Sequence, residues 1–207
     1  MPSLDLEQVR RALRTRPAAR LAEELPRRAA VAMVLRQGSP DLEALFIRRA
    51  EWPGDLWSGH VAFPGGQAEP GESLLRTAVR ETAEEVGLDL EGGAELLGGL
   101  DEIRAIGRGR AVGLSIQPWV FGLLRDPDSL RLSEEVASAH WLRVPDLLDP
   151  SRQAPYPYEF EGMQLELPSL RVDGLVIWGL TYQMLGSFAV AVAGASHLGH
   201  PGGRRAG

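Results

Sequence analysis

The sequence predicts an α/β fold, with a mixed β-sheet lying between helices as an α/β/α sandwich. Short apolar segments typical of strands are spread along the chain, and one uninterrupted helix-forming run over residues 73–86 divides them. Further helical segments stand near the two ends. With 207 residues, 44% of them hydrophobic, the chain is long enough to bury a substantial core in one main domain.

The N-terminal half begins with an amphipathic helix over residues 4–15. Apolar runs at 28–36 and 43–49 predict two strands joined as a hairpin through the turn at Ser39-Pro40. A long loop then leads to a short strand at 60–63, and Pro64-Gly65-Gly66 turns the backbone toward the helix at 73–86.

The second half is expected to add strands and two helices. The expected segments are strands at 94–103, 112–124 and 137–142, a loop at 104–109, a short helix at 144–148, a hairpin over 160–170 and a strand end entering a helix over 176–192. We expect an N-terminal helical extension at 1–26, a main domain at 27–193 and a disordered tail at 194–207, which is rich in Gly, Ala and Arg.

Charge and composition narrow the classes of partner. The net charge of −6 supplies no overall positive field for nucleic acid, and no apolar run has the length of a membrane span, so we expect neither partner. The absence of cysteine excludes disulfides, thiolate catalysis and thiolate zinc sites, and it fits a cytoplasmic protein.

The helix at 73–86 carries an unusual group of acids. A buried stripe is expected at Leu75, Ala78, Val79, Thr82 and Val86, with Glu81, Glu84 and Glu85 on a different side at i, i+3 and i+4 spacing. Such acids often do no more than solvate an exposed helix face. In a cleft, however, two carboxylates ~4 Å apart at an effective dielectric of ~20 repel by about 4 kcal/mol. A divalent cation such as Mg²⁺ or Mn²⁺ would remove that repulsion.

The spacing of these residues resembles a known signature. From Gly66, five residues lead to Glu72, seven more to Arg80-Glu81, and then come Glu84-Glu85 and Gly87-Leu88. This is similar to the box of the Nudix hydrolases, G-x5-E-x7-R-E-U-x-E-E-x-G-U, where U is a bulky aliphatic residue. Every polar and glycine position matches, and Thr82 departs from the pattern at a U position on the buried side.

The resemblance implies an α/β/α sandwich with one catalytic helix. It also implies that water attacks a diphosphate in the presence of Mg²⁺ or Mn²⁺. It implies that Glu81 and Glu85 ligate the cation, with Glu84 as a third ligand or as the residue that orients the attacking water. The same resemblance implies that the carbonyl of Gly66 completes this set. Arg80 would orient Glu84, and Glu72 would be a supporting acid near the start of the helix.

A second, narrower resemblance concerns the segment before the box. Arg49-Ala50, Gly59 and Phe63-Pro64-Gly65-Gly66 are similar to the coenzyme A pyrophosphatase branch, and so is the segment at 177–181. The spacer departs from that branch, because Trp52, Asp55 and Trp57 stand where basic and small residues are usual. The resemblance implies a small-molecule nucleotide substrate and makes a homodimer plausible.

Several assignments have two readings. The general base can come from the box or from a later loop, where Glu134 and Glu135 are candidates or else a solvated acid pair. Likewise Arg48, Arg49 and Arg104 either grip phosphates or lie on the ordinary surface, and Trp52 and Trp57 either stack on adenine or pack at an interface.

Three functions remain open at this point. The leading one is hydrolysis of coenzyme A or its thioesters to 4′-phosphopantetheine and 3′,5′-ADP. The others are a pyrophosphatase of ADP-ribose, NADH, nucleoside triphosphates or dinucleoside polyphosphates, and a nucleotide-sensing domain without catalysis. The intact set Glu81, Glu84 and Glu85 argues against a sensor.

Overall fold

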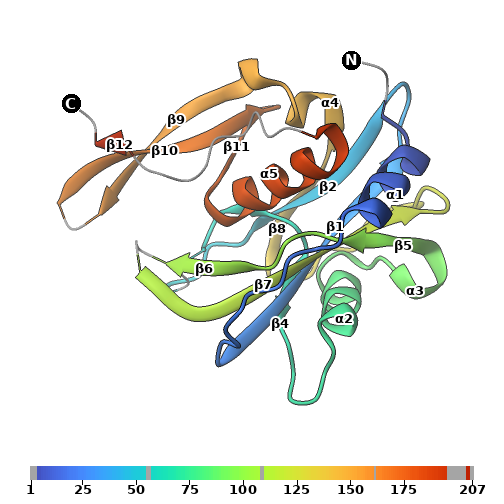
Figure 1. The fold of residues 1–207 in the computed structure, drawn as a ribbon, viewed down its shortest axis with the longest axis horizontal. Helices are drawn as coiled ribbons and strands as arrows, with labels where there is room; N and C mark the ends of the chain where they lie inside the picture. Colours follow the sequence, from blue (N-terminus) through green and yellow to red (C-terminus); the bar gives the residue numbers. More distant parts are fainter. Residues whose placement is uncertain (1–3, 55–56, 108–109, 161, 195–203, 206–207) are drawn as a thin grey trace.

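A mixed sheet of eight strands runs through the centre of the molecule, with helices on both faces (Figure 1). The computed structural model describes residues 4–54, 57–107, 110–160, 162–194 and 204–205. The strands of this main sheet are β1 (Arg27–Gln37), β2 (Leu42–Arg49), β3 (Val61–Ala62), β4 (Gly65–Gln67), β5 (Ala94–Gly99), β6 (Ile103–Gly107), β7 (Arg110–Leu123) and β8 (Val136–Arg143).

Strand β1 occupies the middle of the sheet. It pairs antiparallel with β2 and parallel with β7, and the path β3-β2-β1-β7-β5 is completed by β4 beside β1, β6 beside β7 and β8 beside β2. The sheet is therefore mixed, and the predicted hairpin of the first two strands is confirmed.

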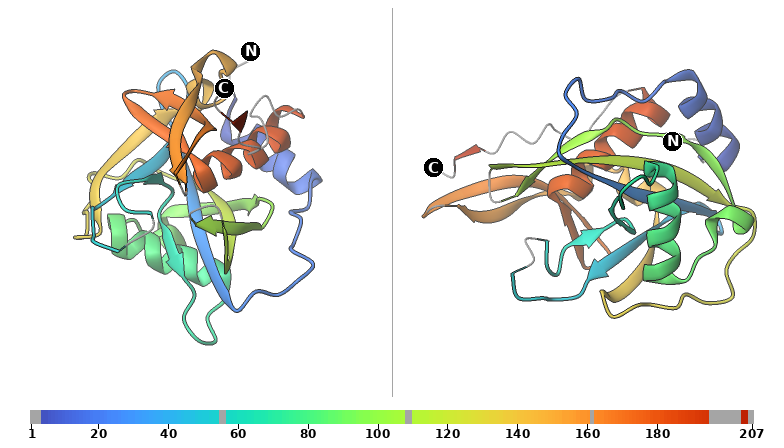
Figure 2. Two further views of the ribbon diagram at one scale, coloured as in Figure 1. Left: turned by 90° about the vertical axis from the view of Figure 1, so that its left-hand side faces the viewer. Right: turned by 90° about the horizontal axis from the view of Figure 1, so that it is seen from below.

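The helices form the outer layers. They are α1 (Leu6–Thr15), α2 (Leu74–Val86), α3 (Leu90–Gly93), α4 (Val144–Leu147) and α5 (Gly179–Ala193), with a 3₁₀ turn at Pro150–Arg152. Figure 2 shows α1 and α5 on one face of the sheet and α2 on the other. This arrangement of helices on both faces of a mixed sheet confirms the predicted α/β/α sandwich.

The alternation of side chains along β1 explains the two layers of core. Met33 and Leu35 belong to the cluster under α1 and α5, whereas Ala32 and Val34 belong to the cluster under α2. Because successive residues of a strand point to opposite faces, one continuous apolar run serves both cores.

A second sheet extends from the main body at the C-terminal side (Figure 1). It contains β9 (Gln153–Phe160), β10 (Met163–Val172), β11 (Leu175–Trp178) and β12 (Arg204–Arg205). The ring of Trp178 stacks on Tyr156 at 4.4 Å between centroids and lies 4.6 Å from the ring of His60. These contacts hold the second sheet against the loop that enters β3.

Several expected segments differ from the structure, and the strand expected at 94–103 ends at Gly99. The loop expected at 104–109 is instead strand β6 as far as Gly107, because these residues pair with β7, and residues 108–109 lie outside the described part. The hairpin expected over 160–170 is longer, since its first strand begins at Gln153. Most of the expected tail lies outside the described residues, but Arg204–Arg205 pair with β10.

Candidate active site

Two glycines bring the backbone of β4 close to its neighbours. Gly65 has a φ of +153°, and a Cβ there would lie 2.6 Å from the Cα of Val31. A Cβ on Gly66 would lie 2.6 Å from Oε2 of Glu81. Only glycine therefore allows β4 to lie against both β1 and the carboxylate of Glu81.

Helix α2 begins and ends with standard caps. The hydroxyl of Ser73 accepts a hydrogen bond from the N–H of Arg76 at 3.3 Å, and Gly87 ends the helix with a φ of +72° while its N–H donates to the carbonyl of Ala83. These caps fix the residues at which the helix begins and ends.

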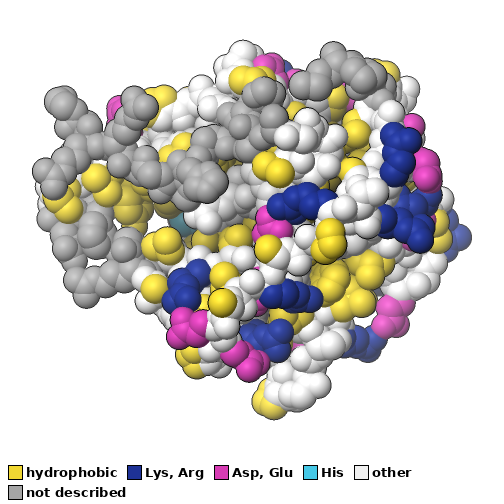
Figure 3. Space-filling view, in the orientation of Figure 1, with side chains coloured by type: hydrophobic (Ala, Val, Ile, Leu, Met, Phe, Trp, Pro, Cys, Tyr) yellow, Lys and Arg dark blue, Asp and Glu magenta, His cyan; other side chains and the backbone are white. Residues whose placement is uncertain are grey.

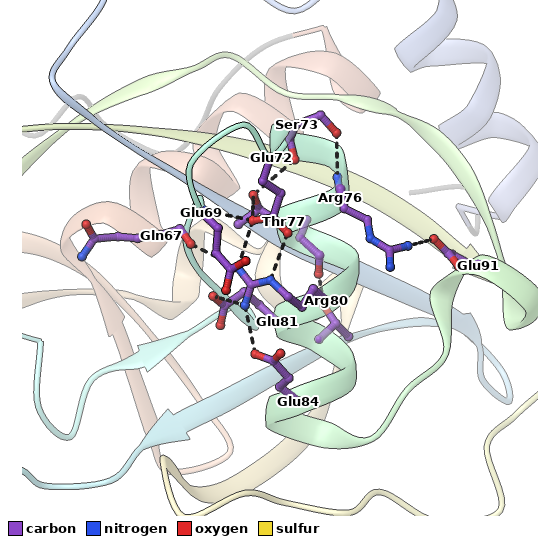
Figure 4. A network of polar contacts seen from close by, with 12 residues as sticks. Gln67, Glu69, Glu72, Ser73, Arg76, Thr77, Arg80, Glu81, Glu84 and Glu91 are labelled. Carbon is purple, nitrogen blue, oxygen red and sulfur yellow. Dashed lines mark hydrogen bonds and ion pairs between the residues drawn. The ribbon is translucent and has the colours of Figure 1, made fainter.

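Arg80 lies at the centre of the acidic network (Figure 4). Its guanidinium makes a two-pronged pair with Glu72, through Nε to Oε1 at 3.0 Å and Nη2 to Oε2 at 3.0 Å. Its Nη1 also donates to Glu81 at 2.9 Å and to Glu84 at 3.0 Å. The arginine thus orients three carboxylates at once and supplies positive charge between them.

Glu72 is fixed more tightly than a surface acid. Besides Arg80, it accepts hydrogen bonds from the hydroxyl of Thr77 at 2.8 Å and the N–H of Glu69 at 3.0 Å. The Arg80 guanidinium is the main reason that the pKa of Glu72 falls to about 2, with the other two donors acting in the same direction. Glu72 therefore stays ionised and holds Arg80 in place.

Glu85 is the most buried of the acids, with 3% of its surface exposed. Burial raises its pKa to about 7, and the charges of Glu81 and Glu135 add to this, whereas the N–H of Gly65, 2.8 Å from Oε2, and the charge of Arg49 oppose it. Burial also raises the pKa of Glu81, against the opposing effect of Arg80. Burial thus disfavours the charged form of both carboxylates.

This burial corrects the expected helix faces. Glu85 lies on the buried side with Leu74, Thr77 and Thr82, whereas the expected core residues Leu75 and Val79 are only half-buried. Glu84, by contrast, is an exposed side chain at 58%. The three acids therefore occupy three environments, because α2 is rotated so that Glu85 reaches under β4.

A cleft of about 690 Å³ opens beside these acids. Its lining consists of Arg49, Trp52, Glu81, Glu84, Glu85, Ser133, Glu134 and Glu135. Three elements contribute, namely the end of β2 with the loop after it, helix α2, and the loop before β8. The structure thus brings most of the predicted site residues together from distant parts of the sequence.

Three predicted substrate-binding residues do not line this cleft. Arg48 is exposed, and because it precedes Arg49 on β2 it projects from the opposite face of the strand. Trp57 packs against the core under α1 and α5. Arg104 belongs to strand β6 and pairs with Glu23 at 2.9 Å. It is therefore not part of a loop that could close over the site. None of the three therefore lines the cleft beside Glu81, and a role for them in substrate binding stays a prediction.

The cleft also contains two residues, Trp52 and Ser133, that the sequence did not single out as site residues. Trp52, for which stacking on adenine and packing at an interface were both left open, is the tryptophan of this loop that reaches the cleft, with 52% of its surface exposed. Ser133 lines the cleft and was missed entirely. The only available signal was a serine two residues before Glu135, a spacing typical of turns in which a hydroxyl accepts from a nearby backbone N–H.

The donor set suits a divalent cation, although the carboxylates are not arranged as ligands in the present state. Among the described residues, no three acidic or imidazole side chains are grouped to hold a metal. Instead, Glu81 and Glu84 both accept hydrogen bonds from Arg80. Burial raises the pKa of both Glu81 and Glu85, so a divalent cation beside them would favour their charged forms, and the oxygen donors fit Mg²⁺ or Mn²⁺.

On the face seen in Figure 3, arginine side chains lie next to acidic ones and form no continuous basic stripe. None of the helices in the described part has the length and apolar character needed to cross a bilayer.

Comparisons with known proteins agree with the geometry. The sequence model of the NUDIX domain family matches residues 26–160. A protein named peroxisomal coenzyme A diphosphatase, from Caenorhabditis elegans, is 37% identical over 101 residues, covering 47% of this chain and 41% of that protein. An uncharacterized protein of Schizosaccharomyces pombe is 44% identical over 113 residues, covering 53% of this chain but 34% of that protein.

Two longer matches complete the comparison. An uncharacterized Nudix hydrolase of Yersinia pestis, NudL, is 31% identical over 158 residues, which is 74% of each chain. A crystal structure of a MutT/nudix family protein from Enterococcus faecalis covers 92% of this chain with a TM-score of 0.56 at 17% identity, a likeness of fold alone. Since the family model spans more than half of its length, this chain belongs to the Nudix hydrolase family.

Proposed function

We propose that this protein is a cation-dependent pyrophosphatase that hydrolyses the diphosphate linkage of coenzyme A or its thioesters. The single observation that carries the proposal is the cleft in which Glu81, Glu84 and Glu85 of α2 face Arg49 and Glu135. The named activity of the 37% identical relative supports coenzyme A as the first substrate to test. The products would be 4′-phosphopantetheine and 3′,5′-ADP.

The roles of the acids follow from their positions. Glu81 and Glu85, with the carbonyl of Gly66, are the residues we assign to Mg²⁺ or Mn²⁺, and Glu84 either joins them or orients the attacking water. When bound, the cation supplies positive charge that neutralises the oxygens of the diphosphate. Arg80 orients Glu84, and Glu72 is assigned to hold Arg80 and not to act on the substrate.

The opposite wall of the cleft would bind and orient the substrate. Arg49 is the cation among its lining residues, so we assign it to a phosphate oxygen. Glu135 is assigned as the general base, because it lines the same cleft as Glu81 and Glu85. Trp52 offers an exposed ring at the same wall, on which the adenine ring can stack.

The experiment is a substrate panel with identified products. The full chain is incubated with Mg²⁺ or Mn²⁺ and with coenzyme A, acetyl-coenzyme A, NADH or ADP-ribose, and products are identified by mass. We expect 4′-phosphopantetheine from coenzyme A, loss of turnover in Glu84→Gln, and normal turnover in Glu91→Gln. No turnover of any substrate would contradict the reaction, and turnover of NADH or ADP-ribose alone would contradict the substrate. A homodimer stays a prediction that light scattering checks.

A further inference from the structure

The segment Arg131–Val136 docks on the last turn of helix α2. The N–H of Arg131 donates to the carbonyl of Val86 at 3.0 Å, and the N–H of Ser133 donates to the carbonyl of Glu85 at 3.0 Å. The last carbonyls of a helix have no partner within the helix. The loop therefore donates hydrogen bonds to backbone carbonyls in the turn of α2 that carries Glu84 and Glu85.

Gly87 makes this close approach feasible. Its φ of +72° suits glycine, and a Cβ at this position would lie 3.0 Å from the Cβ of Arg131 and 3.4 Å from its N. The glycine that ends the helix thus also leaves room for the docked loop. The register between the loop and α2 is set by these backbone contacts.

Ser133 then fixes the backbone around Glu135. Its hydroxyl accepts a hydrogen bond from the N–H of Glu135 at 3.3 Å, and its carbonyl accepts one from the N–H of Val136 at 3.2 Å. On the other side, the carbonyl of Glu135 accepts from the N–H of Ala50 at 2.8 Å, next to Arg49. The N–H of Glu135 is therefore held by Ser133, which is itself docked on α2, and the carbonyl of Glu135 is held by Ala50, the residue after the end of β2.

Glu135 is thereby placed at the wall of the cleft that faces α2. It lines the cleft together with Ser133, and its charge acts on both Glu81 and Glu85. Glu134 lines the cleft as well, but the hydroxyl of Ser133 holds the N–H of Glu135. The turn thus fixes the backbone at Glu135, the acid whose N–H the hydroxyl binds.

We propose that Ser133 is a positioning residue, which fixes Glu135 so that its carboxylate accepts the proton of the attacking water. The proposal rests on the proposed function. In that step the water oxygen bonds to phosphorus, its proton passes to Glu135, and the bridging P–O bond breaks with its electron pair on the departing phosphate oxygen. Glu135 then releases the proton to solvent. Ser133 itself touches neither water nor substrate.

The side chain and the main chain of Ser133 have separable roles. Ser133→Ala removes the hydroxyl but keeps the N–H that docks the loop on Glu85, so the loop stays attached to α2. Ser133→Thr restores the hydroxyl and is the conservative rescue. Ser151→Ala is the matched control, because Ser151 also makes a short-range turn, with Asp149, but does not line the cleft.

The test uses the full chain with Mn²⁺ and coenzyme A, and amide hydrogen exchange without substrate. For Ser133→Ala we expect kcat to fall about fivefold, the loss typical of one hydrogen bond, with KM unchanged. Exchange over residues 132–136 should be faster, and Mn²⁺ affinity unchanged. Ser133→Thr should restore both kcat and exchange, and Ser151→Ala should match the wild type.

The outcomes separate this proposal from the proposed function. If the wild type hydrolyses coenzyme A and Ser133→Ala keeps its full kcat, the positioning role is wrong. Equal losses in kcat for the alanine and threonine variants would also overturn it, because the hydroxyl would then not be the cause. An inactive wild type would overturn the proposed function, and faster exchange in Ser133→Ala would then show the hydroxyl to be a structural anchor alone.

Discussion

The pair between Glu72 and Arg80 should contribute much more stability than an ordinary helix ion pair. Replacing Glu72 by Gln keeps an oxygen acceptor but removes the charge that Arg80 binds through two hydrogen bonds. The side chains are only 10% and 21% exposed, so solvent screens this pair weakly. The substitution should therefore destabilise the fold and release Arg80 from its position.

The magnitude follows from the pKa of Glu72. It falls from 4.5 to about 2 on folding, mainly through Arg80, which corresponds to about 3 kcal/mol of folding free energy at neutral pH. Because the folded pKa is the lower one, this stability is fully present above pH 4.5. It is lost as the pH falls through about 2.

The assay is urea denaturation of the cation-free protein, followed by circular dichroism at pH 7 and at pH 3. Glu72→Gln should lower the free energy of unfolding by about 3 kcal/mol at pH 7 and by clearly less at pH 3. The control is Glu91→Gln on the exposed pair with Arg76 near the same helix (Figure 4), where about 0.5 kcal/mol or less is expected. Equal losses in the two variants, or a loss that does not depend on pH, would refute the reasoning.

Three other substitutions test separate parts of the cleft. Glu85→Gln should stabilise the cation-free protein by up to about 3 kcal/mol at pH 8 and not at pH 4. The reason is that burial raises the pKa of Glu85 from 4.5 to about 7, so ionisation of this side chain above pH 4.5 opposes folding. Denaturation in EDTA checks this, and a destabilised variant at pH 8 would contradict it. Gly66→Ala should weaken Mn²⁺ binding at least about tenfold, since its Cβ displaces the carboxylate of Glu81, and unchanged affinity in a spin-resonance titration would argue against it. Trp52→Ala should raise the KM for coenzyme A about fivefold while Trp57→Phe leaves it unchanged, and equal KM values would exclude stacking on Trp52.

The helix and the acids were predictable because local chemistry determines them. The glycine turn, the serine cap and the helix-forming run are short-range features, and the structure places α2 at Leu74–Val86, one residue from the expected start. The spacing of the acids also implied a shared site, and Glu81, Glu84 and Glu85 line one cleft.

The errors arose where long-range packing decides. Periodicity shows that Glu85 and Val79 lie on different faces of a helix, but the rotation of α2 against β4 determines that Glu85 is buried. The strand beginning at Gln153 was missed because prolines at 155 and 157 are unfavourable in a central strand, yet β9 pairs with β10 alone and tolerates them. The orientation of Arg48, in contrast, followed from strand alternation and could have been predicted.

The central claim is that the carboxylates of α2 share one divalent cation. The most direct test is a titration of Mn²⁺ into the wild type, Glu85→Gln and Glu91→Gln, followed by the spin resonance of the free ion at pH 8. The account predicts one site in the wild type, the same site in Glu91→Gln, and a loss of at least about 100-fold in affinity in Glu85→Gln. Equal binding of Mn²⁺ by Glu85→Gln and the wild type would contradict it, as would a wild type that binds none.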